Sequence, residues 1–555
     1  MTSAAAPAPL FDDGPLAGTS AIAGTEFEPT ELVGPMAAAP ELRLPRPSRV
    51  RLPIDSAAFA ELKARARTDR GFYRAQDKLR RDVSPPGGPP TAAATTAMPG
   101  GNAGALAMPM PAAPAAPTGP GGPGGPAPAP PALIHSYAGI PFAGWIPYDC
   151  ALAVGPSHVL CAVNSSVAIF PKAGGAALRQ RSLSSWFSGV VQGATVFDPR
   201  LVYDAPADRW VLLATAYDAN GSSWFLLSVS QSGDPMAAWY NYALDARLDG
   251  NHPTTNWADY PGLAYDANAL YLTANMFVWG GGYAYAKLRV VDKSTVYSGA
   301  RATYQDFVGL RNGDGTLAFT VLPCQRVDGA GTQYLVNSLF PPAGAAARRE
   351  ITLWTVTGTP AAPALTQQTV ATDPYAVPPD ADQPGGAAPL ESGDIRLLTA
   401  CAQGNSVWTC LTTVQTWDDG TNAAAVYWLQ IDAAAGAVQQ DAVYGATGRH
   451  YLYPALVPDA QGNALLAFAR VGTAENAALH VASRRHTDSP NALSSSSLVH
   501  PGSSPYTGFD SSGRNRWGDY LGVAADPQEA GLLWAYGGYA AGATTWATWV
   551  CSARP

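Results

Sequence analysis

The sequence predicts an all-β chain folded as a seven-bladed β-propeller, with six blades as the alternative, behind a low-complexity N-terminal region. Charged residues make up only 14% of the chain, whereas 56 residues are glycine and 50 are proline. This composition is typical of short strands joined by tight turns. A two-strand signature also recurs along the chain, as in repeat proteins. The length of 555 residues exceeds that of an ordinary single-core domain, which a repeat architecture accommodates.

The N-terminal region differs in composition from the rest of the chain. Residues 1–132 are rich in Ala, Pro, Gly, Ser and Thr, most strongly over 84–131. Such a segment buries too little apolar surface to offset its chain entropy, so we expect residues 1–132 to be largely disordered. The stretch 54–82 has the pattern of an amphipathic helix with Ser56 as its cap. We expect this helix to be solvated or to be a remnant of a propeptide; the alternative is that it docks on the propeller or on a partner.

The repeated signature, found throughout residues 133–555, is an apolar strand, a turn marked by Asp, Gly, Asn or Pro, and a second apolar strand. It is clearest in WADYPGLAYDANALYLTANMF from Trp257 and in WGDYLGVAADPQEAGLLWAYGGY from Trp517. Aligning the copies gives one marker residue in each unit: Cys150, Pro199, Pro261, Pro323, Ile395, Pro454 and Leu521. The markers are 49, 62, 62, 72, 59 and 67 residues apart, which leaves room for four strands per unit. The copies at Pro323 and Ile395 are the weakest, hence the six-bladed alternative.

Charge and hydropathy argue against two classes of partner. The formal net charge is −8 and no cluster of Lys and Arg is present, which argues against nucleic acid and against anionic membrane. The most apolar window, Asn268 to Ala286, contains three consecutive glycines and fits two strands with a turn, so no transmembrane helix is expected. The N-terminus has neither the basic nor the apolar segment of a secretory signal.

The six cysteines favour an oxidising compartment and hence an extracellular or cell-surface location. Two pairs flank predicted hairpin turns and two cysteines remain as a third pair, giving as disulfide candidates Cys150 with Cys161, Cys401 with Cys410, and Cys324 with Cys551. The alternative is six buried free thiols, because the small apolar side chain of Cys packs well in strands.

Several segments resemble those of bacterial exported β-propeller proteins of the sialidase-like superfamily, the Asp-box or BNR type. They begin at Tyr148 (YDCALAVGPSHVLCAVNSSV), Phe197 (FDPRLVYDAPADRW), Trp257 and Arg514 (RNRWGDYLGVAADP). The stretch from Ser228 to Trp239 is similar to the Asp-box turn but lacks its Gly and Thr spacing. That box is a structural turn remote from catalysis, so the resemblance implies a propeller and export and leaves the activity open.

The residues around the start of each inner strand are expected to gather at one mouth of the central channel. The candidates for binding are Asp149, Asp198, Arg200, Asp394, Arg396, Tyr453, Arg516, Trp257 and Trp517, and the candidates for catalysis are Asp259, Asp519, Tyr260 and Tyr520. Two carboxylates in different environments could cleave a glycoside, a tyrosine could act as a sialidase-type nucleophile, and arginines could clamp an acidic sugar. The structural alternative is that the aspartates hold turns or pair with arginines between blades, and that the tryptophans pack.

Two functions follow from these residues. We expect a recognition module that binds an extracellular glycan or protein through the channel mouth, because the chain lacks a specific catalytic motif. The alternative is a carbohydrate-active enzyme, a glycoside hydrolase or polysaccharide lyase, that uses the Asp, Tyr and Arg residues of the rim. No cofactor and no metal site are expected. The turns at Asn312–Gly315 and Asp418–Gly420 only distantly resemble calcium loops.

Overall fold

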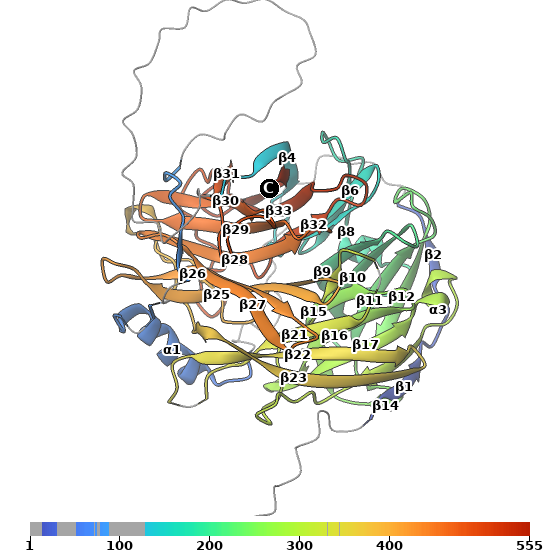
Figure 1. Cartoon of the computed structure of the whole chain (residues 1–555). Coiled ribbons are helices and arrows are strands. Elements are labelled where there is room, and N and C mark those ends of the chain that lie inside the picture. Colours follow the sequence, from blue (N-terminus) through green and yellow to red (C-terminus); the bar gives the residue numbers. More distant parts are fainter. Residues whose placement is uncertain are drawn as a thin grey trace, which may run out of the picture.

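The computed structural model describes residues 14–29, 52–71, 73–74, 78–87, 128–329, 331–342 and 344–555. Most of the low-complexity run predicted over 84–131 therefore lies outside the described residues. The described strands form small sheets in which neighbouring strands are antiparallel, except for two short parallel pairings. Figure 1 shows these sheets side by side around the molecule.

Within the described ranges, seven sheets have four or more strands, and a two-stranded ribbon accompanies them. Sheet 1 contains β5 (Ala151–Val154), β6 (His158–Val163), β7 (Ser166–Pro171) and β8 (Arg179–Ser182). Sheet 2 contains β9 (Thr195–Asp204), β10 (Arg209–Tyr217), β11 (Ser223–Ser230), β12 (Trp239–Asp245) and β2 (Thr25–Phe27). Sheet 3 contains β15 (Asn256–Tyr265), β16 (Ala269–Val278), β17 (Tyr283–Asp292), β18 (Thr303–Phe307) and β1 (Leu16–Thr19). Sheet 4 contains β19 (Leu322–Pro323), β21 (Gln333–Ser338), β22 (Arg348–Thr359) and β23 (Ala362–Tyr375).

The remaining three sheets come from the C-terminal part of the chain and from two N-terminal strands. Sheet 5 contains β20 (Gln325–Arg326), β24 (Thr399–Gln403), β25 (Ser406–Thr416), β26 (Asn422–Asp432), β27 (Ala437–Gly445) and β3 (Arg80–Arg81). Sheet 6 contains β28 (Arg449–Pro458), β29 (Ala464–Gly472), β30 (Glu475–Arg484) and β31 (Ser497–His500). Sheet 7 contains β32 (Gly522–Ala525), β33 (Leu533–Ala540), β34 (Trp546–Arg554) and β4 (Ala132–Pro141). The ribbon pairs β13 (Leu248–Asp249) with β14 (His252–Pro253).

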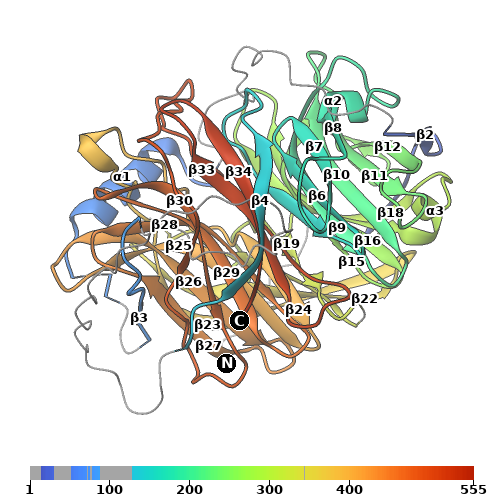
Figure 2. The same cartoon turned by 90° about the horizontal axis from the view of Figure 1, so that it is seen from above.

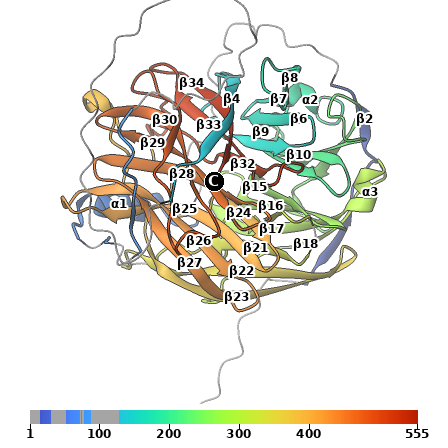
Figure 3. The same ribbon diagram turned by 45° about the horizontal axis from the view of Figure 1, so that its top comes forward.

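The first strands of the seven sheets surround a common centre. Contacts between them run from β5 to β9, β15, β19, β24, β28 and β32, and β32 returns to β5. Figure 3 shows first strands such as β15, β24 and β32 toward the middle and later strands such as β18, β23 and β27 toward the periphery. Every residue of β15 is buried, as expected of a strand covered on both faces. This arrangement is a β-propeller, and the predicted fold class is confirmed at that level.

The ring is closed by a strand that precedes the first sheet in sequence and a strand of the last sheet. β4 precedes the first sheet in sequence but pairs with β34, close to the C-terminus, as the outermost strand of sheet 7. Figure 2 shows β4 beside β34. The backbone hydrogen bonds between β4 and β34 tie the chain just before the first sheet to the last sheet, so that β4 is not left unpaired.

Short segments of the N-terminal region add to the outer edges of the ring, which its composition alone did not predict. β1 extends sheet 3, β2 extends sheet 2 and β3 extends sheet 5. The predicted helix is observed as α1 (Ser56–Thr68), shorter than the expected 54–82. Asp55, and not Ser56, caps it, because its side chain accepts a hydrogen bond from the N–H of Ala58 at 2.7 Å. Two short helices, α2 (Leu183–Trp186) and α3 (Lys293–Tyr297), and one 3-10 turn (Pro384–Gly386) complete the described elements.

The disulfide prediction is wrong, because all six cysteines are free and buried. The strand register gives the reason. Cys161 lies opposite Leu152 in sheet 1, and Cys410 lies opposite Thr399 in sheet 5, so each is two positions away from facing its expected partner. Burial raises the pKa of all six thiols, and that of Cys551 reaches about 12. These side chains act as small core residues. Among the described residues, no helix is long and apolar enough to cross a membrane.

Candidate binding site at the channel mouth

Four of the predicted rim residues share a rare backbone conformation. Asp149, Asp198, Tyr260 and Tyr453 have φ values of 47°, 53°, 51° and 50°, and each directly precedes a marker residue. Left-handed backbone is uncommon for residues other than glycine and is retained where the surroundings hold it in place. At three of the four, the pairing of the first strand with the second is interrupted by a bulge. The repeat therefore specifies a bulged strand start that faces the mouth.

The carboxylates of two of these residues connect neighbouring sheets. Asp149 accepts hydrogen bonds from the side-chain amide of Asn164 and from the N–H of Asp519, the latter at 2.8 Å. Asp198 accepts one from the N–H of Tyr260 at 3.1 Å, and its own N–H donates to Asn164 at 2.7 Å. These contacts join sheets 7, 1, 2 and 3 around the mouth. These two carboxylates thus connect sheets through backbone N–H groups and the Asn164 amide, and not through the expected turns or Asp–Arg pairs.

Two arginines and two tyrosines from different sheets stack at the mouth. The guanidinium groups of Arg200 and Arg396 both lie over the ring of Tyr260, with their central carbons 5.2 and 4.4 Å from the ring centre. Arg200 also lies 3.4 Å from the ring centre of Tyr520. The two rings are edge to face, with centres 5.7 Å apart. Cation–π contacts in a desolvated place like this are each worth about 2 kcal/mol.

The hydroxyl groups of the rim tyrosines are held by the backbone. They donate across the mouth to carbonyl groups: Tyr260 to Asp519 at 3.3 Å, Tyr520 to Pro199 at 3.0 Å and Tyr453 to Glu391 at 2.9 Å. Burial raises the pKa of all three tyrosine hydroxyl groups. At Tyr260, the positive charges of Arg396 and Arg200 lower the pKa again, but by less than burial raises it. A tyrosinate nucleophile is therefore disfavoured at these positions.

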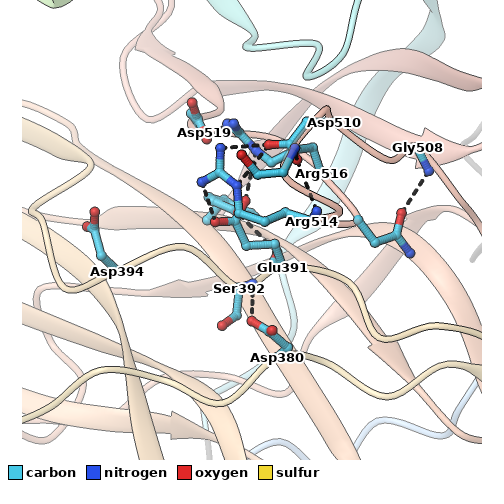
Figure 4. Close-up of polar contacts among 12 residues, drawn as sticks. Asp380, Glu391, Ser392, Asp394, Gly508, Asp510, Arg514, Arg516 and Asp519 are labelled. Carbon is cyan, nitrogen blue, oxygen red and sulfur yellow. Dashed lines mark hydrogen bonds and ion pairs between the residues drawn. The ribbon is translucent and has the colours of Figure 1, made fainter. Parts of the chain in front are cut away.

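Two long loops, most of whose residues lie outside the repeat copies, contribute polar residues to the mouth (Figure 4). Residues 376–398 connect β23 to β24, and residues 501–521 connect β31 to β32. The N–H of Glu391 in the first loop donates to the carbonyl of Asn515 in the second at 2.8 Å. The amide of Gln383 exchanges two hydrogen bonds with the backbone of Tyr506, both 2.8 Å long. The loops therefore brace each other across the ring.

Ion pairs link these loops to the rim, as drawn in Figure 4. Glu391 pairs with Arg514 at 3.1 Å and with Arg516 at 2.8 Å, and Arg516 also pairs with Asp519 at 2.6 Å. Arg396 makes a two-pronged contact with Asp394, with a shortest distance of 2.6 Å. Sequence reasoning missed Glu391 and Arg514. The signal available for them was the spacing of the markers, because the two longest intervals, 72 and 67 residues, contain these loops.

Helix α1 is docked against the first of these loops. The ammonium group of Lys63 donates to Asp380 at 2.9 Å and to the hydroxyl of Ser392 at 2.7 Å. Arg67 donates to the carbonyl of Asp380 at 3.2 Å. Phe59 is buried in one apolar cluster that also contains Tyr260, Trp257 and Tyr520. The favoured expectation of a solvated helix is therefore wrong, and the alternative, docking on the propeller, is observed. The docked helix brings a cation to the edge of the mouth.

Asp149 and Asp519 have opposite pKa shifts. Burial, and then the negative charges of Asp519 and Asp198, raise the pKa of Asp149 well above its usual value. Burial would also raise the pKa of Asp519, but the charges of Arg516 and Arg396 outweigh it and hold that pKa below its usual value. Paired carboxyl groups with divergent pKa values are one requirement for acid–base chemistry. The Asp149 side chain, however, is enclosed, with the residue 1% exposed.

The remaining predicted site residues lie in the protein interior. Trp257 packs on Phe277, with ring centres 5.6 Å apart, and Trp517 packs on Tyr148 at 5.4 Å. Both indoles are buried, which fits the packing role rather than a sugar platform. Asp259 is also buried, on β15 opposite Asn275 of β16.

In the part of the chain that the structure describes, no three or more His, Cys, Asp or Glu side chains are grouped so that they could hold a metal ion. The two calcium-like stretches are hydrogen-bonded turns. Asp314 accepts a hydrogen bond from the N–H of Thr316 at 3.0 Å, and Asp419 accepts one from the N–H of Thr421 at 2.9 Å.

Comparison with known proteins gives only distant structural likenesses. No family model and no curated protein matches the chain. Drosophila semaphorin 1b, extracellular domains 1–2, is 8% identical, with 77% of this chain and 87% of that chain covered and a TM-score of 0.34. The quinohemoprotein alcohol dehydrogenase of Comamonas testosteroni is 11% identical, with 72% of this chain and 67% of that chain covered and a TM-score of 0.31. An exo-β-1,3-galactanase of Phanerochaete chrysosporium is 11% identical, with 60% of this chain and 76% of that chain covered and a TM-score of 0.28. Likenesses at this level carry no functional argument.

Proposed function

We propose that this chain is a seven-bladed β-propeller whose channel mouth recognises a glycan. The seven sheets, each taken as one blade, agree with the seven units counted in the sequence. The observation that carries the proposal is that the rim side chains are already fixed. The enclosed Asp149 and Asp198 hydrogen-bond the backbone that carries the rim, and Asp394 and Asp519 are ion-paired with arginines there. Groups held in this way suit binding, because a ligand does not have to order them.

The part of the mouth that solvent reaches offers both donors and acceptors. The side chains of Asp519 and Arg514 are 30% and 23% exposed, and they come from the same loop. Phe509, in that loop too, is 46% exposed and directly precedes Asp510, which pairs with Arg514. Alternating polar groups beside an apolar ring match a sugar, whose hydroxyl groups and C–H face need both. An extracellular protein with similar surface chemistry is the other partner that this mouth could accept.

A glycan array probed with the full chain tests the proposal. Phe509→Ala should weaken binding by at least about tenfold, because it removes the apolar contact and leaves the ion pairs intact. Leu178→Ala is the matched control. Leu178 is a similarly exposed apolar residue between β7 and β8, at the end of the strands opposite the mouth. If the wild-type chain binds nothing on the array, or if both variants bind equally well, the proposal is wrong.

The alternative, a carbohydrate-active enzyme, is favoured by one observation, the opposite pKa shifts of Asp149 and Asp519. Against it stand the enclosed position of Asp149 and the raised pKa of the rim tyrosines. A hydrolysis screen on neutral and acidic oligosaccharides decides between the two. Turnover that Asp519→Asn abolishes would establish the enzyme and replace the binding function.

The extracellular or cell-surface location remains part of the proposal. It no longer draws support from disulfides, since the cysteines are free. Its remaining support is the resemblance of the repeat units to those of exported propellers. Fractionation of cells that produce the tagged chain would test it directly.

A further inference from the structure

Arg200 differs from the other two arginines of the rim. Arg396 is neutralised by Asp394, and Arg516 by Asp519 together with Glu391. Arg200 forms no ion pair with any residue in the described ranges. Its Nε donates to the carbonyl of Pro261 at 2.8 Å, and its Nη2 is enclosed without a hydrogen-bond partner. The remaining contacts of its guanidinium are with the rings of Tyr520 and Tyr260.

A small cavity begins at Arg200 and follows the channel between the first strands. Its volume is about 60 Å³. Among the side chains that line it, Arg200 is the single charged group, and no Asp or Glu is present. The other polar residues of the lining are Gln325, Thr399, Cys150 and Cys401, of which Thr399 and Cys401 already donate to the carbonyl of Leu456. The cavity therefore has a positive charge, further hydrogen-bond donors and no compensating carboxylate.

The cavity continues away from the mouth. A second cavity, of about 100 Å³, shares Leu152, Leu201, Gln325 and Cys401 with the first, so the two meet. Its two charged lining residues are both neutralised, since Arg326 pairs with Asp328 at 2.6 Å and Asp526 with Lys172 at 2.8 Å. The second cavity extends to the turns at the far ends of the first strands, at Ala205 and Pro527. At the other end, toward the mouth, lie the stacked Arg200 and Tyr520. A small solute would enter from the far side.

Arg200 is partly buried as a residue, but its Nη2 is enclosed, and an enclosed cationic donor that lacks a hydrogen-bonding partner carries a desolvation cost. A partner anion removes that cost. One water molecule needs at least about 10–15 Å³ of such volume, so the cavity has room for a small anion and a few waters. A sugar ring would not fit there.

We propose that the channel cavity beneath Arg200 binds a small monovalent anion, either a halide or the carboxylate of a small organic acid. The guanidinium supplies the charge, and the Gln325 amide supplies a further donor. This site lies on the channel side of the stacked rings and is independent of glycan binding at the outer mouth.

Thermal unfolding of the full chain at constant ionic strength tests the proposal, with sodium chloride, bromide or acetate replacing sodium sulfate. Because sulfate stabilises folded proteins in general by exclusion from their surface, the Tm is compared with that of Arg200→Gln at each salt composition. We expect wild type to gain a saturable advantage with the monovalent anion, of about 2 °C at full occupancy. Arg200→Gln should abolish the saturable rise. Arg349→Gln, which removes one exposed positive charge on β22, should retain it and serves as the matched control. A response to chloride but not acetate assigns a halide site, and the reverse assigns a carboxylate site.

Crystals of the wild-type protein soaked in bromide give a second measurement that does not depend on the variant folding. An anomalous peak in contact with Arg200 would support the site. The proposal is overturned if no monovalent anion gives a saturable rise, if Arg200→Gln responds like the wild type, or if bromide occupies only the outer surface.

Discussion

Asp149, at the start of the first sheet, accepts a hydrogen bond from the backbone N–H of Asp519, at the start of the last sheet, over 2.8 Å. The two residues are 370 positions apart in sequence. This hydrogen bond closes the ring at the channel mouth, whereas the pairing of β4 with β34 closes it at the outer edge of sheet 7. The same Asp149 side chain accepts a second hydrogen bond from Asn164, so one carboxyl group holds both a neighbouring strand and a neighbouring sheet.

Asp149→Ala is therefore expected to destabilise the ring. The substitution leaves the Asp519 N–H and the Asn164 amide without their acceptor, and an unpaired buried polar group costs about 1–3 kcal/mol. We expect a loss of about 2–4 kcal/mol in the free energy of unfolding, measured in urea at neutral pH. Asp149→Asn retains an acceptor oxygen and should lose less. Equal stability of Asp149→Ala and wild type would show that the bond does not hold the ring.

The pH dependence of the same pair gives a second prediction. Burial and the charges of Asp519 and Asp198 raise the pKa of Asp149, so the folded protein holds its proton more tightly than the unfolded chain does. The stability from this group is fully present below the unfolded value of about 4 and is lost as the pH rises through the folded pKa. The stability of wild type relative to Asp149→Asn should therefore fall from about pH 4 upward, as measured by urea unfolding. An advantage of wild type that grows with pH would contradict this.

The inner strands could be predicted because their sequence repeats from sheet to sheet. The loops of the outer mouth could not, because their residues do not repeat. Pro199, Pro261, Pro323 and Pro454 each lie in a first strand, because the bulged strand start repeats in sequence as well as in space. Glu391 and Arg514 lie in loops with no repeat. Their pairing depends on two segments that meet only after the ring has formed.

The weakest repeat copy also has a structural reason. After Pro323 the chain leaves sheet 4, and Gln325 and Arg326 pair in parallel with β24 of sheet 5. β19 is thus only two residues long, and the signature of an apolar strand followed by a turn is cut short. A sequence pattern based on one continuous inner strand could detect this unit only faintly.

Lys63 should stabilise the first mouth loop from the N-terminal helix. Lys63→Met removes the hydrogen bonds to Asp380 and Ser392 but keeps the length of the side chain. We expect faster amide hydrogen exchange over residues 380–392, by about tenfold, with little change in global stability. Arg65→Met is the control, since Arg65 pairs only with Asp69 of the same segment among the described contacts. Faster exchange in both variants, or in neither, would show that Lys63 does not hold this loop.

The cysteines should all react as thiols once the protein is unfolded, and not before. Each thiol is buried and has a raised pKa, and the thiolate is the reactive form. We expect native protein, purified without reductant, to resist iodoacetamide near pH 8 and denatured protein to be alkylated at all six positions, as measured by intact mass. A denatured sample that requires a reductant for full alkylation would restore the disulfide prediction.

Asp82 should anchor the N-terminal segment to the ring. Its buried carboxylate accepts hydrogen bonds from Arg470 at 2.9 Å, from the Tyr451 hydroxyl at 3.0 Å and from the N–H of Ser496 at 3.0 Å. Removing one partner of a buried ion pair costs about 3–5 kcal/mol, so Asp82→Ala should lose about that much in urea unfolding. Asp69→Ala, at the exposed end of α1, should lose less than about 1 kcal/mol and is the control.

The acid sensitivity of Asp82 follows from its charge environment. Burial alone would raise its pKa, but Arg470 and the Ser496 hydrogen bonds outweigh this and lower the pKa to about 2. The stability that Asp82 contributes is present above the unfolded value of about 4 and is lost as the pH falls through the folded pKa. Wild type should therefore lose its advantage over Asp82→Ala between about pH 4 and pH 2, as followed by tryptophan fluorescence. If Asp82→Ala and Asp69→Ala are equally stable at neutral pH, the segment that contains Asp82 is not docked on sheets 5 and 6.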